Sequence, residues 1–281
     1  MDSIAILLVV LSGLVHSIWN LFAKQSLNKN VFLWYCQWAA ILVFLPFVWM
    51  EAKTIEAIPL NGFLLVAASM VLHGAYMLLL AKAYAIGDLS QVYPIMRGTS
   101  PLLVPIVGVL VLGESLNAYG WIGVALILLG IFLLGDRHGR RSWRINRAMA
   151  VAFAVGLLIS SYTIVDKLAL QHIPAFTLNM ASNVGNLVAL SFVAIGSGEL
   201  RRERQANWKT ILLGGVLAPG GYLLFLKALE IMPVSQLAPM REIGTVFGTL
   251  LGILVLRETQ GRLRLMASVA ITVGIILLAQ S

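Results

Sequence analysis

Apolar runs of about 20 residues follow one another along almost the whole 281-residue sequence, and they restrict the fold more than any other feature. A helix of that length spans the roughly 30 Å hydrocarbon core of a bilayer. The connections between the runs are too short to hold a soluble domain. The sequence therefore predicts ten transmembrane helices, near residues 3–23, 31–50, 61–86, 89–112, 117–135, 148–168, 175–196, 207–230, 233–256 and 262–280.

The composition favours an all-α integral membrane protein. Hydrophobic residues make up 59% of the chain and charged residues 11%, whereas soluble domains have roughly 45–50% and about 25%. A transmembrane barrel would alternate apolar and polar residues, but these runs are apolar on all sides. The one cysteine, Cys36, excludes an internal disulfide, and we expect no cofactor and no metal site.

An internal repeat divides the sequence into two halves. Residues 90–92 (Ser-Gln-Val) recur as residues 235–237 (Ser-Gln-Leu), an offset of 145. Beyond Pro94 and Pro239 the offset is 144, and it aligns Arg97 with Arg241, Leu112 with Leu256, Glu114 with Glu258, and Gly130 with Gly274. In the first and sixth spans, Gly13 and Lys24 match Gly156 and Lys167 at an offset of 143.

The repeated unit contains five spans, so it predicts a first repeat over 1–136, a second over 148–281 and a basic linker over 137–147. An odd number of crossings makes the second repeat enter the membrane from the opposite side. Such inverted repeats are typical of secondary transporters, whose binding site lies between the repeats near the midplane.

Positive charge gathers in three of the connections and predicts the orientation of the chain. The net charge of +8 therefore does not form a face that could bind nucleic acid. The three basic connections lie on one side of the membrane, and the connections on the other side carry only Lys53, Lys167 and Lys227. We therefore expect both termini to face away from the cytoplasm. The basic residues are Arg137, Arg140, Arg141, Arg144 and Arg147 after span 5, Arg201, Arg202, Arg204 and Lys209 after span 7, and Arg257, Arg262 and Arg264 after span 9.

Spans 4 and 9 are the strongest candidates for a solute site. Prolines interrupt both, and broken helices at equivalent positions of two repeats point to a transport site. Arg97, close to Tyr93, and its counterpart Arg241 could each hold a carboxylate or phosphate, which favours an anionic or zwitterionic solute. The alternative is that each arginine reaches the headgroups or pairs with Glu242.

Two further groups of polar residues are candidates for the pathway. His16, Trp19 and Asn20 share one face of span 1, and Asn179 and Asn183 share one face of span 7. The first group could instead form hydrogen bonds between helices. The protonatable candidates for coupling to H+ are His16, Asp166 and Glu242.

The pattern of Pro94, Arg97, Pro101 and Glu114, repeated in part as Pro239, Arg241 and Glu258, resembles the EamA family of the drug/metabolite transporter superfamily. This resemblance implies ten helices in two inverted repeats around a central cavity, and export of amino acids, metabolites or drugs by alternating access without ATP. Members of the family are commonly drawn with both termini in the cytoplasm, whereas the arginine distribution here indicates the reverse.

The sequence is thus interpreted as a secondary transporter that exports a small metabolite, amino acid or amphipathic compound across the cytoplasmic (inner) membrane. A Gly244, Gly248, Gly252 run would pack a neighbouring helix or form a homodimer. The alternatives are a membrane-embedded enzyme and a solute sensor that does not transport. The sequence has no Walker loop, HExxH or GxSxG motif, which argues against ATP hydrolysis and against the enzyme.

Overall fold

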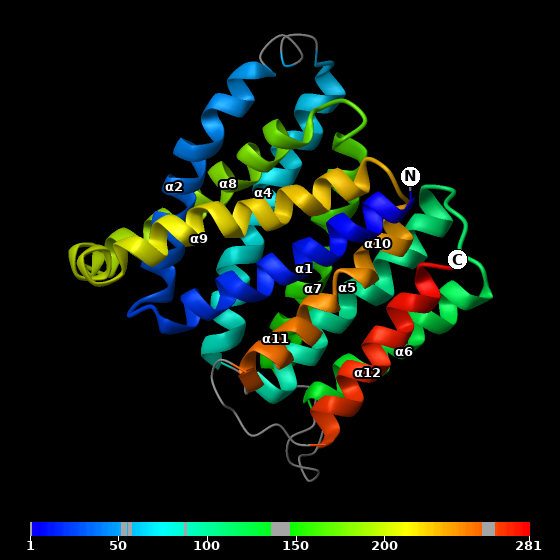
Figure 1. Ribbon diagram of the computed structural model, residues 1–281. Coiled ribbons are helices and arrows are strands. Elements are labelled where there is room, and N and C mark those ends of the chain that lie inside the picture. Colours follow the sequence, from blue (N-terminus) through cyan, green and yellow to red (C-terminus); the bar gives the residue numbers. More distant parts are fainter. Residues whose placement is uncertain (1, 52–54, 56–57, 87–88, 136–146, 255–261) are drawn as a thin grey trace.

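The computed structural model describes residues 2–51, 55, 58–86, 89–135, 147–254 and 262–281, and every regular element within these ranges is a helix (Figure 1). The helices are α1 (Asp2–Gln25), α2 (Lys29–Met50), α4 (Leu60–Ile86), α5 (Leu89–Val111), α6 (Ala118–Gly135), α7 (Arg147–Ala169), α8 (Ala175–Gly196), α9 (Leu200–Leu229), α10 (Val234–Met240), α11 (Ile243–Leu254) and α12 (Arg262–Leu278). The predicted linker, apart from Arg147, and Glu258 lie outside the described residues.

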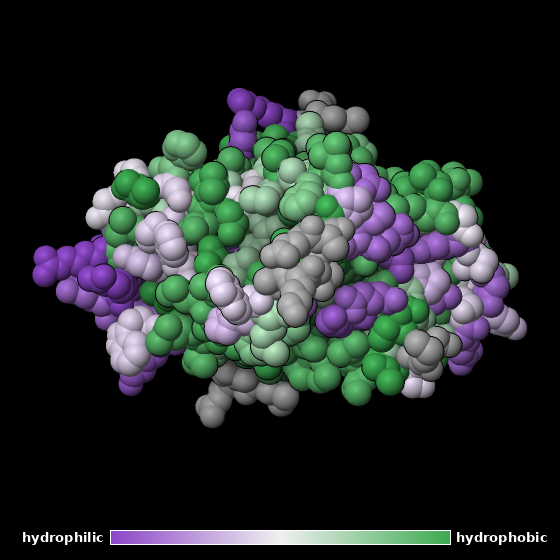
Figure 2. All heavy atoms as spheres, turned by 90° about the horizontal axis from the view of Figure 1, so that it is seen from above, coloured by the Kyte–Doolittle hydropathy of each residue, from purple (hydrophilic) through white to green (hydrophobic). Residues whose placement is uncertain are grey.

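The helices are long and apolar enough for a multi-pass membrane protein. Among the described residues, six helices meet the length and hydropathy of a membrane span, within α2, α4, α5, α7, α8 and α9, and shorter apolar helices lie in α1, α6 and α12. Apolar residues cover much of the face in Figure 2, and the hydrophilic group at its left edge lies at the start of α9. Such extensive apolar surface is unfavourable in water and matches a lipid environment.

Helix α9 begins before the predicted span. Its first turns carry the exposed residues Arg201, Arg202 and Arg204, and the backbone leaves helical geometry at Asn207 (φ −124°, ψ 19°). The Asn207 side chain donates to Glu203 Oε1 at 2.7 Å. The charged start is therefore separated from the apolar part of the helix, which begins where the sequence predicts the span.

The main contacts between helices are preserved when the two halves are exchanged. Helix α1 packs on α9 and α11 as α7 packs on α4 and α5, and α2 packs on α9 as α8 packs on α4. The pairs α2 with α8, α5 with α10, and α6 with α12 lie across the exchange axis. In the last pair Gly123 approaches Gly274 while Gly130 approaches Ala267, so these equivalent helices are antiparallel. Antiparallel equivalents are what a duplicated unit of five helices requires.

Two glycine contacts show the same relation at residue level. A Cβ atom on Gly13 would lie 2.5 Å from Cγ2 of Ile243, and one on Gly156 would lie 2.4 Å from Cβ of Thr99. The offsets found in the sequence relate Gly13 to Gly156 and Thr99 to Ile243. The weaker match between the first and sixth spans therefore corresponds to equivalent positions in space.

Spans 4 and 9 differ, and the prediction that both would be broken is wrong for span 4. Helix α5 continues through Pro94, Pro101 and Pro105. Each proline removes one backbone donor, but packing against neighbouring helices lets a membrane helix continue through such positions. Span 9 does break, between α10 and α11, where Glu242 N donates to Pro239 O at 3.0 Å and Thr245 N donates to Glu242 O at 2.9 Å. These bonds span three residues instead of four, and they place Glu242 outside regular helix.

Polar side chains hold the turn between α9 and α10 at one end of the bundle. Glu114 accepts hydrogen bonds from the backbone N–H groups of Val234 (2.9 Å) and Ser235 (2.8 Å), as expected of a cap at this position. Lys167 Nζ donates to the carbonyl oxygens of Leu229 (2.5 Å) and Met232 (3.0 Å). Side chains of both the first and the second half of the chain therefore stabilise this turn.

Candidate functional site

A cavity of about 420 Å³ lies between the two halves. It is within the size range of small-molecule sites. Helices of both repeats contribute to its wall, and it reaches the end of the bundle where Lys29 and Asn30 begin α2. The residues that line it are His16, Trp19, Lys29, Asn30, Leu33, Tyr76, Met77, Leu80, Ala81, Tyr93, Met96, Arg97, Val155, Ile159, Leu190, Gly244 and Thr245.

Arg97, which lines this cavity, forms an ion pair with Glu242 of the other repeat, a residue that lies behind the lining. Arg97 Nη2 of α5 is 3.3 Å from Glu242 Oε2, and the two side chains are 24% and 7% exposed. Arg97 lines the cavity, and Glu242 is presented by the break between α10 and α11. Charges within membrane spans are costly and are normally paired or face a polar cavity. Arg97 therefore pairs with Glu242, which is one of the two alternatives that the sequence leaves open, and it also lines the cavity.

The rest of the wall is mainly aromatic and apolar. Trp19 Nε1 donates to His16 Nδ1 at 3.2 Å, and both residues face the cavity. Tyr76 and Tyr93 lie on the wall as well. The structure therefore brings four of the predicted residues, His16, Trp19, Tyr93 and Arg97, to one compartment. The side chain of Asn20 lies outside the described ones.

The structure does not bring Arg241 to the cavity. Its guanidinium carbon lies 5.1 Å from the ring centre of Tyr222 and 4.5 Å from that of Phe225. These distances are typical of cation–π contacts, which are favourable where the cation is shielded from water. Arg97 and Arg241 occupy matching positions in the repeats, but in this conformation only Arg97 is available to a solute in the cavity.

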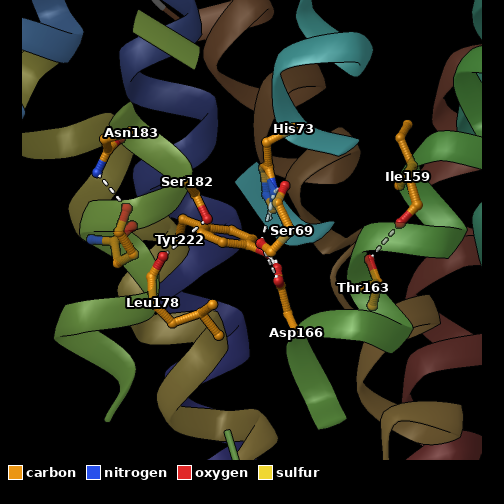
Figure 3. A network of polar contacts seen from close by, with 10 residues as sticks. Ser69, His73, Ile159, Thr163, Asp166, Leu178, Ser182, Asn183 and Tyr222 are labelled. Atoms are coloured by element: carbon orange, nitrogen blue, oxygen red, sulfur yellow. Dashed lines mark hydrogen bonds and ion pairs between the residues drawn. The ribbon is translucent and has the colours of Figure 1, made fainter. Parts of the chain in front are cut away.

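Asn179 and Asn183 also lie away from the cavity, on the buried side of α8. Asn179 Nδ2 donates to the carbonyl of Pro219 on α9 at 3.2 Å, and Asn183 Nδ2 donates to the carbonyl of Asn179 at 2.8 Å. Figure 3 shows the Asn183 side chain and, as a dashed line, the hydrogen bond that it donates. The asparagines thus form one hydrogen bond between helices and one within α8.

Asp166 lies in a second polar cluster, which is separate from the cavity lining. Its side chain is completely buried and accepts hydrogen bonds from Ser69 Oγ at 2.5 Å and from the Tyr222 hydroxyl (Figure 3). His73 Nε2 is 3.8 Å from Asp166 Oδ2. The sequence analysis named Asp166 but did not predict Ser69, because helix periodicity does not show which residues of α4, α7 and α9 meet.

Sequence reasoning also missed Lys29, Met77 and Thr245 as cavity residues. Thr245 follows the arginine and glutamate of span 9 by one helical turn, a signal that would have found it. Lys29 was assigned to a connection between spans, and nothing in its spacing indicates that it faces the cavity.

Two halves of related sequence that pack with exchange symmetry around a solute-sized cavity define a multi-pass membrane transporter. The model of the EamA-like transporter family matches the chain twice, over residues 3–135 and 146–280. The chain therefore belongs to the EamA-like transporter family, which is part of the drug/metabolite transporter superfamily.

Curated relatives agree with this class. An uncharacterized transporter in the cobO 3' region of Sinorhizobium sp is 42% identical over 77 residues, which cover 27% of this chain and 54% of the relative, so the match spans about half of that protein. A protein of Lactobacillus johnsonii whose name proposes sugar uptake is 24% identical over 198 residues, 67% of each chain. A solved crystal structure covers 98% of this chain and 96% of its own with a TM-score of 0.78, and at 14% identity it shows the fold alone.

Proposed function

We propose that this transporter is a secondary transporter that exports a small zwitterionic solute with an apolar body across the cytoplasmic membrane by alternating access. The observation that carries the proposal is Arg97, which lines a cavity that is otherwise mainly aromatic and apolar and which pairs with Glu242 directly behind the lining. A solute with one carboxylate and one ammonium group matches both members of the pair. An amino acid with an apolar side chain is the simplest compound of this kind.

Binding would exchange one set of ionic contacts for another. The solute carboxylate takes a place beside Arg97, whose guanidinium offers paired donors, and the ammonium group takes a place beside Glu242. Each buried charge keeps a partner throughout, which avoids the high cost of leaving a charge unpaired. Trp19, Tyr76 and Tyr93 then cover the apolar part of the solute.

The two ends of the bundle support a one-sided conformation. The cavity reaches the end where α2 begins, and Asn28 at that end is bound to Glu199 (2.8 Å) and Glu203 (2.7 Å) near the arginine-rich start of α9. By the positive-inside rule this end faces the cytoplasm. At the other end Glu114 and Lys167 hold the turn between α9 and α10. Release on the far side requires these contacts to separate, as alternating access demands.

Sugar uptake is the second candidate function, since the name of one relative proposes it. A sugar carries no charge to match Arg97 or Glu242, so the pair would contribute less to its binding. The two candidates therefore predict different solute preferences.

The test is a transport screen with purified protein in liposomes, using radiolabelled amino acids, sugars and cationic drugs with and without a pH gradient. We expect apolar amino acids or similar zwitterions to be moved, Arg97→Ala to abolish their flux, and the surface variant Lys227→Gln to keep it. Flux of sugars or cations that is equal in wild type and Arg97→Ala would contradict the proposal.

A further inference from the structure

The Asp166 cluster is built differently from the other buried polar groups of the described chain. Ser69 Oγ donates to Oδ1 and the Tyr222 hydroxyl donates to Oδ2, so both carboxylate oxygens have partners from other helices. His73 Nε2 faces Oδ2 at 3.8 Å. Three helices, α4, α7 and α9, thus converge on one carboxylate within the membrane-spanning part of the bundle. Groups of this kind inside membrane proteins often mark proton relays.

The contacts of His73 determine where its own proton lies. His73 Nδ1 is 3.0 Å from the backbone carbonyl oxygen of Ser69, and a carbonyl oxygen can only accept a hydrogen bond. The hydroxyl hydrogen of Ser69 is already donated to Asp166. Nδ1 therefore carries a hydrogen atom, and Nε2 is the nitrogen that gains or loses a proton.

Nε2 and Asp166 Oδ2 face each other as two acceptors unless one of them is protonated. With a neutral imidazole and a carboxylate, the pair has a charge of −1 and leaves Nε2 without a hydrogen. Addition of one proton to Nε2 brings the pair to zero charge and turns the 3.8 Å contact between two acceptors into an ion pair between imidazolium and carboxylate. The geometry thus favours the binding of one proton by this pair.

The cluster is connected both to the cavity and to the helix break. Tyr76 lines the cavity and contacts Tyr162 at a ring distance of 5.7 Å, and Tyr162 stacks on His73 at 4.1 Å. On the other side the Tyr222 ring lies between Asp166, which accepts its hydroxyl hydrogen, and the guanidinium of Arg241. Arg241 precedes Glu242, the partner of Arg97.

The charged and titratable groups near Asp166 come from the helices that surround it and from the break between α10 and α11. They are His73 and Tyr76 on α4, Tyr162 on α7 itself, Tyr222 on α9, and Arg241 at the break between α10 and α11. Among these residue types only histidine titrates near neutral pH in its ordinary state, because aspartate titrates at lower pH and tyrosine and arginine at much higher pH.

We infer that His73 and Asp166 form a binding site for one proton, which couples solute movement to the proton gradient through Tyr222 and Arg241. This inference rests on the proposed transport function but uses residues outside the solute cavity. Proton binding removes the negative charge that faces Arg241 across the Tyr222 ring. Arg241 is then less strongly held on α9, and the break that presents Glu242 to Arg97 can rearrange.

The first test observes the proton without any solute. Purified full-length protein with ¹⁵N-labelled histidine is placed in phosphatidylethanolamine and phosphatidylglycerol vesicles, and the His73 signal, assigned with His73→Gln, is titrated by NMR. In Asp166→Asn the titration midpoint of His73 falls by about one pH unit or more, because the anion that favours the imidazolium is gone. Ser69→Ala shifts it in the opposite direction, because loss of the hydrogen bond that stabilises the carboxylate increases the affinity of the pair for the proton. The surface control Glu230→Gln does not change it. An unchanged midpoint in Asp166→Asn would overturn the inference.

The second test measures coupling in the same vesicles with the radiolabelled amino acids of the transport screen. The quantity measured is the accumulation driven by a gradient of one pH unit, divided by the exchange at equal pH. In Asp166→Asn this ratio falls by about tenfold or more, because one coupled proton contributes a factor of ten per pH unit. An unchanged ratio overturns the inference. If wild type moves none of the compounds, the transport proposal fails instead, and the NMR titration still decides whether the proton site exists.

Discussion

Arg97 and Arg241 occupy equivalent positions in the two repeats but have different surroundings. Arg97 reaches the cavity and pairs with Glu242 at 3.3 Å, whereas Arg241 lies over the rings of Tyr222 and Phe225, away from the cavity. Their helices differ as well, since α5 is continuous and span 9 breaks beside Arg241. A symmetric sequence position has therefore produced an asymmetric site.

The difference indicates a conformation that is open at one end. In inverted-repeat transporters the two halves exchange conformations when access changes sides. On this account Arg97 serves the solute in the present state, and Arg241 leaves the aromatic rings when the other side opens.

The largest effect is expected from breaking the ion pair. Glu242→Gln removes the carboxylate that pairs with Arg97 inside the bundle, which should lower the free energy of unfolding by about 3 kcal/mol. The corresponding change on the aromatic side, Arg241→Gln, leaves no unpaired carboxylate and should cost about 1 kcal/mol. Thermal unfolding in detergent measures both.

The double variant Arg97→Gln with Glu242→Gln is the control for this prediction. It removes both charges, so it should recover most of the stability lost in Glu242→Gln. Equal destabilisation in the single and the double variant would show that the loss comes from packing and not from the positive charge of Arg97.

A smaller effect is expected from the glycines that relate the two halves. Gly13→Ala and Gly156→Ala each place a methyl group against Ile243 or Thr99, and we expect each to lower stability by about 2 kcal/mol. Gly248→Ala is the matched control, because a Cβ there would meet nothing within 4 Å. If one of the two variants lost no more stability than Gly248→Ala while the other lost about 2 kcal/mol, the halves would not pack equivalently.

The smallest effect is expected from exchanging each arginine for lysine. Arg97→Lys keeps the charge but loses the paired donors, so the KM of the transported zwitterion should rise about tenfold. Arg241→Lys keeps a cation over the rings and should change KM by less than about threefold, because it does not line the cavity. A larger KM effect at Arg241 than at Arg97 would reverse the assignment of the two residues. Initial rates of uptake into liposomes give both values.

Much of the architecture could be predicted from the sequence. Apolar runs give the helices, and the matched offsets at Gly13, Arg97 and Gly130 give the duplicated unit, since both depend on local composition and register. Arg97 could be predicted as a cavity residue because a charge beside prolines in a span needs a polar environment. The orientation in the membrane stays a prediction.

The asymmetry between the halves could not be predicted. The sequence aligns Arg97 with Arg241, and only the conformation adopted by the whole bundle separates their roles. The meeting of Ser69, His73 and Asp166 depends on how α4, α7 and α9 rotate against one another. Helices that are apolar on all sides carry little information about that rotation.

The most direct test compares equilibrium binding with transport for the zwitterion identified in the liposome screen, in Arg97→Ala and Arg241→Ala. The account predicts that both variants lose transport, but that only Arg97→Ala loses binding to the purified protein, by about 100-fold, because a charged hydrogen bond is removed. If Arg97→Ala binds the solute as wild type does, the Arg97–Glu242 pair is not the solute site.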